Sequence, residues 1–382
     1  MRLEKEKNMK KLRIGIIGTG EIALDHARQY KKWDDVEIVA GADLIPGKAR
    51  EYLDKFGWTE ATAYEGDDAC EQLCARNDND AVSVCTYNTQ HARCAIAALD
   101  SGKNVLLEKP MCVTLEEGIE IMRAEKRNGK FVTIGFQPRW NPNCQKVKSI
   151  VESGELGDVY YVQIGGSRRR GIPGGTFIEK RTAAFGAIGD LGCYSLDLAL
   201  NSIGYPKPLT VSAYTSNYFG KNPKYYEESE RLDVDDFSAA FIRLEGKNGE
   251  DIILDYRMAW AMHMDNCSPF VILGKDAGLK AVVPEPVPMW GSIMNGWFGH
   301  LYEMRDIGGS PMTVELPLSP KKIDDISADM WTKKVRTFID ACFTNGPAPV
   351  PTSQIIYNQA IIDAMVRSAA ERREVKVEIP EV

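Results

Sequence analysis

The chain of 382 residues is 44% hydrophobic and 26% charged, and its formal net charge is −7. This length suffices for two domains with separate cores, and the negative charge argues against nucleic acid as a partner. No apolar run reaches the roughly 20 residues of a membrane helix, and the charged start lacks the apolar segment of a signal peptide. We therefore expect a cytoplasmic protein that binds neither membrane nor nucleic acid. The nine cysteines form no zinc-binding pattern, so we also expect reduced thiols and no metal site.

The first 137 residues alternate short apolar runs with helical patterns. The runs predict strands over residues 13–17, 36–43, 62–64, 81–85, 104–107 and 131–136. Helices are predicted between them, including one that begins after Thr114, where Glu117 completes a capping box. Strands and helices that alternate at this spacing predict α/β architecture with a parallel, doubly wound sheet, a Rossmann domain over residues 1–137.

Residues 138–382 have a different pattern, in which strands outnumber helices. Alternating runs predict strands over 159–166, 210–216, 237–244 and 251–258, with a last strand near Val375. Helices are predicted over 143–152, 187–203, 330–343 and 353–372. Residues 282–319, rich in Pro, Gly and Met, are assigned no element. The pattern predicts a C-terminal α+β domain with a large, mostly antiparallel sheet, which we expect to bind substrate and to join subunits.

A dinucleotide-binding motif follows the first predicted strand. Its residues are Gly18-Thr19-Gly20-Glu21-Ile22-Ala23, which fit the pattern G-x-G-x-x-G/A between a strand and a helix. The glycines permit a tight turn and a close backbone approach, and the helix N-terminus faces the pyrophosphate. Asp43 ends the second strand, 20 residues after Ala23. A carboxylate there accepts hydrogen bonds from ribose hydroxyls, so the motif favours NAD, with NADP as the alternative.

Polar residues follow the later strands of the same sheet, where doubly wound sheets bind ligands. Thr86, Asn88 and His91 follow the fourth strand, and we assign them to the nicotinamide side of the cofactor, although a purely structural loop is the alternative. Gln137 follows the sixth strand and is assigned to the cofactor as well.

Lys109, in Glu108-Lys109-Pro110, ends the fifth strand, and we expect both Glu108 and Lys109 to contact the cofactor. The lysine ammonium could also reach a substrate hydroxyl and lower the pKa of that hydroxyl. A second set of polar residues, Asp190, Tyr194 and Asp197, recurs at helical spacing, so the three are expected on one face of a helix. A phenol beside a cationic lysine is a plausible proton carrier for a secondary alcohol.

These motifs together resemble the glucose–fructose oxidoreductase, inositol dehydrogenase and rhizopine-catabolism family (Gfo/Idh/MocA) over nearly the whole chain. The resemblance implies that Lys109 is the catalytic lysine and that Asp190 binds substrate. Many members carry histidine where this chain has Tyr194, and usually proline where it has Tyr87. The resemblance also implies a homo-oligomer, a dimer or tetramer.

Three consecutive arginines, Arg168-Arg169-Arg170, follow the first strand of the second domain. They resemble a segment of family members that oxidise sugars and glycosides. Strand alternation would place Arg168 and Arg170 on one face, as a clamp on sugar hydroxyls or on an anionic group. Solvated or structural arginines are the alternative. A sugar pocket could also be walled by aromatic residues, namely Trp260, His263, Trp297 and His300.

The residues therefore predict an NAD-dependent oxidoreductase. Its substrate would be a sugar, glycoside or cyclitol whose secondary hydroxyl is oxidised, such as the 3-hydroxyl of a glucoside. Lys109, Asp190 and Tyr194 would act on that hydroxyl, and no metal is needed, because the nicotinamide takes the hydride. The alternatives are an inositol or aryl-diol dehydrogenase, a redox-neutral enzyme with tightly bound NAD that promotes elimination or glycoside cleavage, and a nucleotide-sensing regulator.

Overall fold

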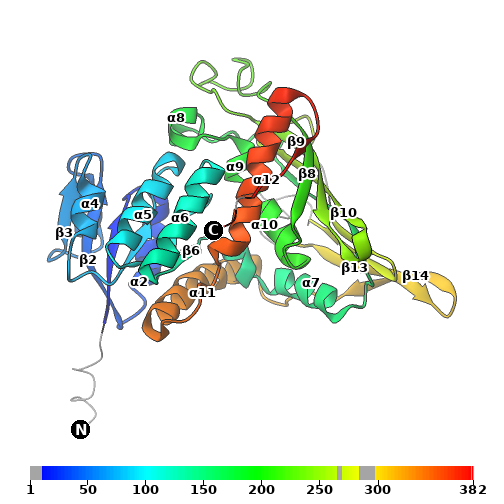
Figure 1. Ribbon diagram of the computed structural model, residues 1–382, viewed down its shortest axis with the longest axis horizontal. Helices are drawn as coiled ribbons and strands as arrows, with labels where there is room; N and C mark the ends of the chain where they lie inside the picture. The colour runs from blue at the N-terminus through cyan, green and yellow to red at the C-terminus, as the bar shows by residue number, and fades with distance from the viewer. Residues whose placement is uncertain (1–10, 265–268, 284–296, 380, 382) are drawn as a thin grey trace, which may run out of the picture.

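The computed structural model describes residues 11–264, 269–283, 297–379 and 381. Two sheets lie side by side, each with helices packed against it (Figure 1). The charged start and residues 284–296, within the segment that was assigned no element, lie outside the described residues.

The first sheet has the strand order β3-β2-β1-β4-β5-β6, and every pairing in it is parallel. Its strands are β1 (Leu12–Ile17), β2 (Val36–Asp43), β3 (Thr62–Glu65), β4 (Ala81–Val84), β5 (Asn104–Leu107) and β6 (Val132–Ile134). Its connecting helices are α2 (Glu21–Tyr30), α3 (Lys48–Lys55), α4 (Ala69–Cys74), α5 (His91–Asp100) and α6 (Leu115–Asn128). The α/β prediction is confirmed, and Thr114 and Glu117 form the predicted capping box of α6.

The second sheet has nine strands in the order β14-β13-β12-β11-β7-β10-β9-β8-β15. All its pairings are antiparallel except that of β7 with β10, as predicted for this half of the chain. The strands are β7 (Val159–Ser167), β8 (Pro208–Ser216), β9 (Phe237–Glu245), β10 (Asp251–Ala259), β11 (Phe270–Gly274), β12 (Ala277–Val282), β13 (His300–Ile307), β14 (Ser310–Leu316) and β15 (Val375–Lys376).

The helices of the second half are divided between the two sheets. Figure 1 shows α12 (Thr352–Glu371) beside strand β8, and α12 also contacts α6, whereas α11 (Ile323–Thr344) packs against α2 and β1 of the first sheet. Val335, Phe338 and Ile339 of α11 join the core formed with β1 and α2. Shorter helical segments are η2 (Asn88–Gln90), η3 (Gln137–Trp140), α7 (Pro142–Ser153), η4 (Gly175–Phe177), α8 (Lys180–Ala183) and η5 (Lys247–Gly249).

The single helix predicted over 187–203 is wrong. It is broken at Leu191 into α9 (Ala187–Asp190) and α10 (Gly192–Ser202). Close packing explains the glycines around the break: a Cβ at Gly189 would lie 2.7 Å from the Phe185 ring, and one at Gly192 would lie 2.0 Å from the Tyr256 hydroxyl. Asp190 lies before the break, and Tyr194 and Asp197 lie after it on α10. Asp197 pairs with Arg139, whereas Asp190 pairs with Lys109.

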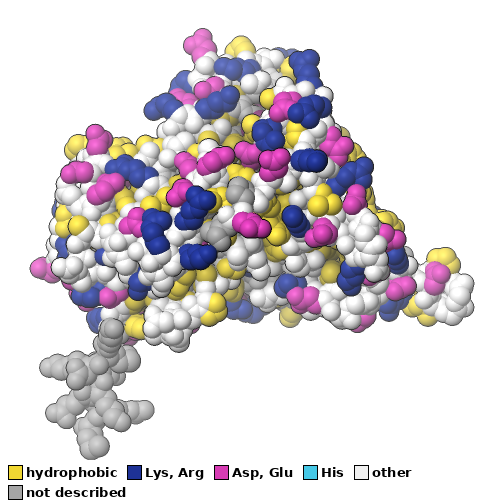
Figure 2. Space-filling model, in the orientation of Figure 1, with side chains coloured by type: hydrophobic (Ala, Val, Ile, Leu, Met, Phe, Trp, Pro, Cys, Tyr) yellow, Lys and Arg dark blue, Asp and Glu magenta, His cyan; other side chains and the backbone are white. Residues whose placement is uncertain are grey.

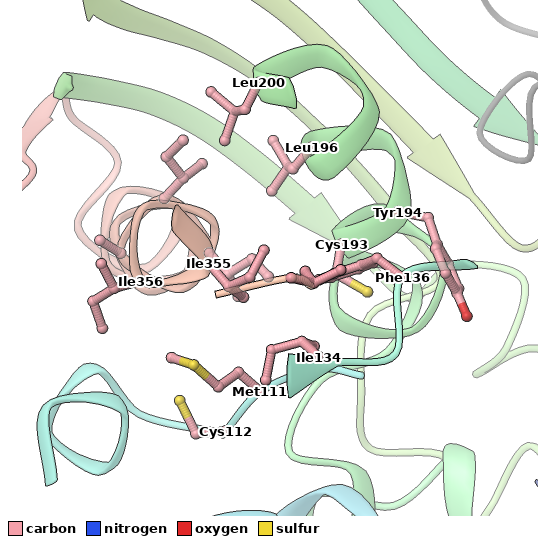
Figure 3. Close-up of a cluster of buried hydrophobic side chains, with 14 of the residues drawn as sticks. Met111, Cys112, Ile134, Phe136, Cys193, Tyr194, Leu196, Leu200, Ile355 and Ile356 are labelled. Carbon is pink, nitrogen blue, oxygen red and sulfur yellow. The ribbon is translucent and has the colours of Figure 1, made fainter. Parts of the chain in front are cut away.

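A buried apolar cluster joins the two halves behind this break. Figure 3 shows side chains from β6, α10 and α12 packed together, with Tyr194 at the edge of the cluster and its hydroxyl pointing away from the apolar side chains. The tyrosine is thus held by packing while its polar end is left for hydrogen bonding.

On the surface, acidic and basic side chains are interspersed over the face shown in Figure 2. Among the described residues, no single helix is long and apolar enough to cross a membrane. One bent pair of helical segments, Lys180–Asp190 and Gly192–Ser202, would together be long and apolar enough. The α10 part of this pair is almost entirely buried in the fold.

Candidate active site

The glycine motif forms the turn between β1 and α2. Gly18 has φ +81°, and a Cβ there would lie 2.7 Å from the backbone of Cys85 and of Thr86, so the position requires glycine. Gly20 is the N-cap of α2, and a Cβ on it would meet no described atom within 4 Å. The helix N-terminus therefore opens onto free space, with Glu21 and Ile22 in its first turn, as a pyrophosphate site needs.

Asp43 lies beside this turn at the end of β2. Its Oδ2 accepts hydrogen bonds from the Thr19 amide at 2.9 Å and the Thr19 hydroxyl at 2.8 Å. Its Oδ1 accepts one from the Ile45 amide at 3.0 Å, and Lys48 Nζ lies 3.6 Å from Oδ2. A carboxylate offers about four acceptor positions. Asp43 therefore fastens the glycine turn and keeps limited capacity for a ribose hydroxyl.

The segment after β4 is partly structural. The two ring nitrogens of His91 lie 2.6 Å from the Pro110 carbonyl oxygen and 3.1 Å from that of Thr86, and the ring is buried. Burial lowers the pKa of this imidazole, so the neutral ring donates to only one of the two carbonyls. Its enclosure between the rims after β4 and β5 favours a structural role over the expected cofactor contact. Asn88 donates a hydrogen bond to the Ala183 carbonyl at 2.9 Å, which joins the rim to α8.

Glu108 also differs from expectation. Its carboxylate is buried and receives hydrogen bonds from His26 Nε2 at 2.8 Å and from Lys334 Nζ at 2.6 Å. A side-chain contact with the cofactor is therefore excluded for Glu108. Its neighbour Lys109 points the other way, toward α9.

Lys109 is held by the residues around the helix break. Its Nζ lies 2.9 Å from Asp190 Oδ1 and 3.1 Å from the Asp190 carbonyl oxygen. Asp190 Oδ2 accepts a hydrogen bond from the Trp260 indole at 3.0 Å. Both carboxylate oxygens are thus engaged, and the buried Trp260 fixes the orientation of the pair instead of walling a pocket.

Tyr194 completes a triangle with these residues. The ammonium of Lys109 lies 5.0 Å from the centre of the Tyr194 ring, and the phenol donates a hydrogen bond to Gln137 Oε1 at 3.2 Å. Phe136 packs edge-on against the same ring. Lys109, Asp190, Tyr194 and Gln137, predicted from three separate motifs, therefore lie together.

The protonation states follow from burial and from neighbouring charges. Burial favours the neutral form of Lys109, but the Asp190 carboxylate outweighs it and raises the pKa of the lysine above its ordinary value. Burial raises the pKa of the Tyr194 phenol, and the Lys109 charge only partly opposes this. Without ligand the site therefore holds an ammonium paired with a carboxylate, beside a protonated phenol.

The arginines do not share a face, because β7 ends at Ser167 and strand alternation stops there. Arg168 is buried enough to lower the pKa of its guanidinium, and the charge of Asp190 opposes this shift, which places Arg168 toward the site. Arg170 instead stacks on the rings of Phe219 and Tyr225, 4.8 and 4.9 Å from their centres. Of the two arginines expected to hold the substrate, only Arg168 therefore lies toward the site.

The remaining aromatic residues of the expected sugar pocket lie elsewhere. His263 packs against Phe219, outside the Lys109 cluster. Trp297 lines a hollow with Asn143 and Leu318, and His300 pairs with Glu315 on the neighbouring strand. The expectation of a pocket wall is not met by these three side chains.

Two neighbouring aspartates were missed at the sequence level. Asp235 accepts hydrogen bonds from the amides of Gly186 and Ile188 at 2.8 and 2.9 Å, at the start of α9. The carbonyl of Asp236 accepts one from the Trp260 amide at 2.8 Å. This segment therefore positions both Asp190 and the indole that binds it. The acidic pair in Asp233-Val234-Asp235-Asp236 before a strand was the available signal.

The residues fit a nicotinamide dinucleotide. A Cβ at Gly20 would meet no described atom within 4 Å, so a phosphate can approach the backbone there, and Thr86 Oγ1 is buried with no partner among the described residues. An unpaired buried hydroxyl is costly, and a ligand beside it would satisfy it. Within the described part of the chain, no cluster of three His, Cys, Asp or Glu side chains could hold a metal ion.

Comparison with known proteins agrees with this geometry. Residues 12–136 match the profile described as "Oxidoreductase family, NAD-binding Rossmann fold", and residues 144–280 match the GFO/IDH/MocA C-terminal domain. The chain belongs to the GFO/IDH/MocA family. For this family member, the two profiles cover the nucleotide motif, Lys109, Asp190 and Tyr194.

Curated relatives of this GFO/IDH/MocA chain include two dehydrogenases. D-glucoside 3-dehydrogenase of Escherichia coli K12 is 33% identical over 55% of this chain and 59% of its own length. Inositol 2-dehydrogenase of Salmonella paratyphi B is 37% identical over 38% of this chain and 43% of its own. The chain thus spans about half the length of these relatives. Levoglucosan dehydrogenase in complex with NADH shares the fold, with a TM-score of 0.78 at 21% identity over 97% of this chain and 100% of that one.

Proposed function

We propose that this chain is an NAD-dependent dehydrogenase that oxidises a secondary hydroxyl of a sugar, glycoside or cyclitol. The observation that carries the proposal is the Lys109 ammonium, held 2.9 Å from the Asp190 carboxylate at the ligand-binding edge of the sheet that carries the glycine motif. A cation there can bind the reacting oxygen, and the adjacent carboxylate can bind a second hydroxyl.

Each residue has a distinct proposed role. Lys109 donates a hydrogen bond to the reacting oxygen and stabilises negative charge that develops on it. Asp190, oriented by Trp260, accepts a hydrogen bond from the substrate. Before it can take the hydroxyl proton, Lys109 must release one of its own, and we propose that it does so when substrate displaces it from Asp190 and the positive charge of bound NAD lowers its pKa. The hydroxyl proton then leaves through Lys109 and Tyr194 to solvent, and Gln137 holds the phenol in place. Bound NAD would supply the hydride acceptor.

NAD is proposed over NADP because of Asp43. Its carboxylate is fixed beside the glycine turn by Thr19, and a negative charge there repels a 2′-phosphate. Lys48, 3.6 Å from that carboxylate, weakens the repulsion without removing it. We therefore expect a preference for NAD, with measurable binding of NADP.

Among sugars, the 3-hydroxyl of a glucoside is the proposed target. The support is the likeness to D-glucoside 3-dehydrogenase, which extends over more of this chain than the likeness to inositol 2-dehydrogenase. Arg168 is proposed to contact the substrate from the end of β7. We also propose a cytoplasmic homo-oligomer. The support for an oligomer is the exposed apolar side chains of the second sheet, including Phe241 of β9 at 57% and Ile307 of β13 at 51% exposure.

The test follows nicotinamide fluorescence while glucose, methyl glucosides, sugar phosphates and inositols are added to the protein with NAD. Lys109→Met and the exposed Lys333→Met serve as variant and matched control. We expect NADH formation with a glycoside, retained in Lys333→Met and lost in Lys109→Met, although Lys109→Met still binds NADH. Turnover in Lys109→Met would contradict the proposal. Bound NAD without net NADH from any ligand would favour the redox-neutral enzyme.

A further inference from the structure

A buried ionic network lies directly behind the proposed catalytic lysine. Its centre is the Glu108 carboxylate, whose Oε1 lies 2.6 Å from Lys334 Nζ and 2.8 Å from His26 Nε2. The side chains of His26 and Lys334 are fully buried, and that of Glu108 is 4% exposed. A charged lysine and glutamate so far from solvent are costly unless each is paired, so the geometry of this pair is tightly defined.

The network joins three elements that are far apart in the chain. Lys334 lies on α11, 226 residues from Glu108, and His26 lies on α2, 82 residues from it. His26 Nδ1 continues the network to Ser83 of β4 at 3.2 Å. The helix expected to bind the pyrophosphate is therefore tied, through one carboxylate, to the segment that connects β5 to Lys109.

The backbone around Glu108 leaves little freedom for a different position. The Glu108 amide donates to the Val84 carbonyl at 3.0 Å, and the Gly135 amide donates to the Leu107 carbonyl at 2.8 Å. A Cβ at Gly135 would lie 2.9 Å from Glu108 Oε1. The carboxylate thus fills the space between strand ends, and its side chain and that of Lys109 leave the strand in opposite directions.

The lysine on α11 is itself held in place. Lys334 Nζ lies 3.8 Å from the centre of the Trp331 ring, which also packs edge-on against His26. Lys333, the preceding residue, is exposed. The helix therefore presents one buried ammonium to the sheet, and this ammonium donates a hydrogen bond to Glu108.

We propose that Lys334 is a positioning residue for Lys109: by binding Glu108, it fixes the end of β5 relative to α2, and hence the lysine ammonium relative to the bound nucleotide. This inference rests on the proposed function for its catalytic consequence. A displacement of about 1 Å in a reacting group can cost a factor of about 100 in rate. The effect of losing Lys334 should therefore appear in kcat, while nucleotide affinity, set by the α2 turn, should change little.

The test compares Lys334→Met with Lys333→Met. Hydrogen exchange of the peptide 104–112, which spans β5 and Lys109, reports on positioning without any turnover. We expect this peptide to exchange about tenfold faster in Lys334→Met, because its opening free energy falls, while the peptide 159–167 of β7 is unchanged. With a substrate that supports turnover, kcat should fall about 10- to 100-fold, and the dissociation constant of NADH should stay the same.

A second variant separates positioning from a merely structural role. Glu108→Gln combined with Lys334→Met removes both charges, and such neutral replacements of buried ion pairs usually restore stability. If Lys334→Met alone does not fold, the double variant is measured in its place. We expect the unfolding midpoint to recover toward that of the unmodified protein while kcat stays low and the 104–112 peptide still exchanges fast. Recovery of kcat together with the midpoint would show a structural role only.

The inference and the proposed function can fail separately. If the unmodified protein turns over no substrate, the proposed function fails, and the exchange of peptide 104–112 still decides whether Lys334 positions the strand end. If folded Lys334→Met matches Lys333→Met in that exchange and in kcat, the inference is overturned while the dehydrogenase assignment stands.

Discussion

Replacing Asp190 by Asn tests the proposed electrostatics of the site. The change keeps the shape of the side chain and removes the negative charge 2.9 Å from Lys109 Nζ. At that distance the gross attraction is about 6 kcal/mol for an effective dielectric constant of about 20. Because desolvation offsets part of it and the Asp190 carbonyl still accepts a hydrogen bond, we expect a net loss of roughly 3 kcal/mol of unfolding free energy.

The sign of the pH dependence follows from the raised pKa of Lys109. A base whose folded-state pKa exceeds its ordinary value of 10.5 contributes its full stabilisation below that value and loses it only as the pH rises through the higher pKa. The stabilisation that the pair gives the unmodified protein should therefore be the same at pH 7 and pH 9. With the carboxylate gone, burial remains, so the pKa of Lys109 should fall below 10.5.

Two measurements check this expectation. Urea unfolding at both pH values gives the shift in midpoint. NMR of protein with ¹³C-labelled lysine follows the ε-carbon signal of Lys109, identified by its loss in Lys109→Arg. In the unmodified protein the signal should not titrate up to pH 10.5, and in Asp190→Asn it should. A Lys109 signal that already titrates below 10.5 in the unmodified protein, or one unaffected by Asp190→Asn, would refute the reasoning.

The other predictions concern the turn, the indole and the missed aspartate. Gly18→Ala should weaken NADH binding about 10- to 100-fold, because the φ of +81° at Gly18 and its 2.7 Å approach to the Cys85 backbone exclude a Cβ. The control is Gly47→Ala, where φ is similar but a Cβ would meet no atom within 4 Å. Equal NADH affinities of the two variants in fluorescence titrations would contradict the prediction. Trp260→Phe removes a hydrogen bond to a charged group, worth about 1.5–3 kcal/mol, so kcat/KM should fall about 10- to 100-fold; unchanged steady-state kinetics would show that the indole does not orient Asp190. Burial raises the pKa of Asp235 to about 6, so the folded chain retains a proton that the unfolded chain loses, and stability should fall as the pH rises from about 4 to about 6. Asp235→Asn should reduce the change of the urea unfolding midpoint with pH. An unchanged pH dependence would show that other groups cause it.

The parts of the site that the sequence predicts are local in the chain. The glycine turn, the lysine at the end of β5 and the pair Asp190 and Tyr194 each lie in a short motif, and short motifs fix which sheet edge or helix carries a residue. Parallel strands bring their carboxyl ends to one edge, so the first two motifs had to converge. Apolar periodicity also predicted the strands of the first sheet and β7, β8, β9, β10 and β15 of the second, but it missed β11, β12, β13 and β14.

Short motifs do not predict contacts between residues that are far apart in the chain. Trp260 lies 70 residues from Asp190, and Asp235 lies 49 from Gly186, and no periodicity links residues at such distances. A tryptophan was expected as a sugar-stacking wall because aromatic rings serve both purposes; only its burial and its indole contact reveal the difference. Likewise, nothing in the local sequence of α11 shows that Lys334 faces the first sheet.

The errors have a common physical cause: neighbouring groups in the fold, both backbone carbonyls and aromatic rings, bind the side chains that were assigned to ligands. His91 was assigned to the cofactor from its place after β4, but its buried ring lies between two backbone carbonyls. The Arg168 and Arg170 clamp assumed that strand alternation continues, but β7 ends at Ser167 and Arg170 turns to an aromatic pair. In each case the side chain satisfies a local structural need that residue type alone does not reveal.

The pairing of Lys109 with Asp190 also bears on which alcohols the site would accept. Neither the lysine nor the phenol is a ready base without ligand, because the pKa of each is raised. A substrate must therefore intervene in the pair, placing one oxygen on Lys109 and another group on Asp190 Oδ1. Trp260 keeps Asp190 Oδ2 bound at 3.0 Å, so the carboxylate stays in place when the lysine leaves it. A molecule with two adjacent hydroxyls replaces both halves of the ion pair, whereas a simple alcohol leaves one charge unsatisfied. This is a physical reason for the proposed class of sugars, glycosides and cyclitols that does not depend on any relative.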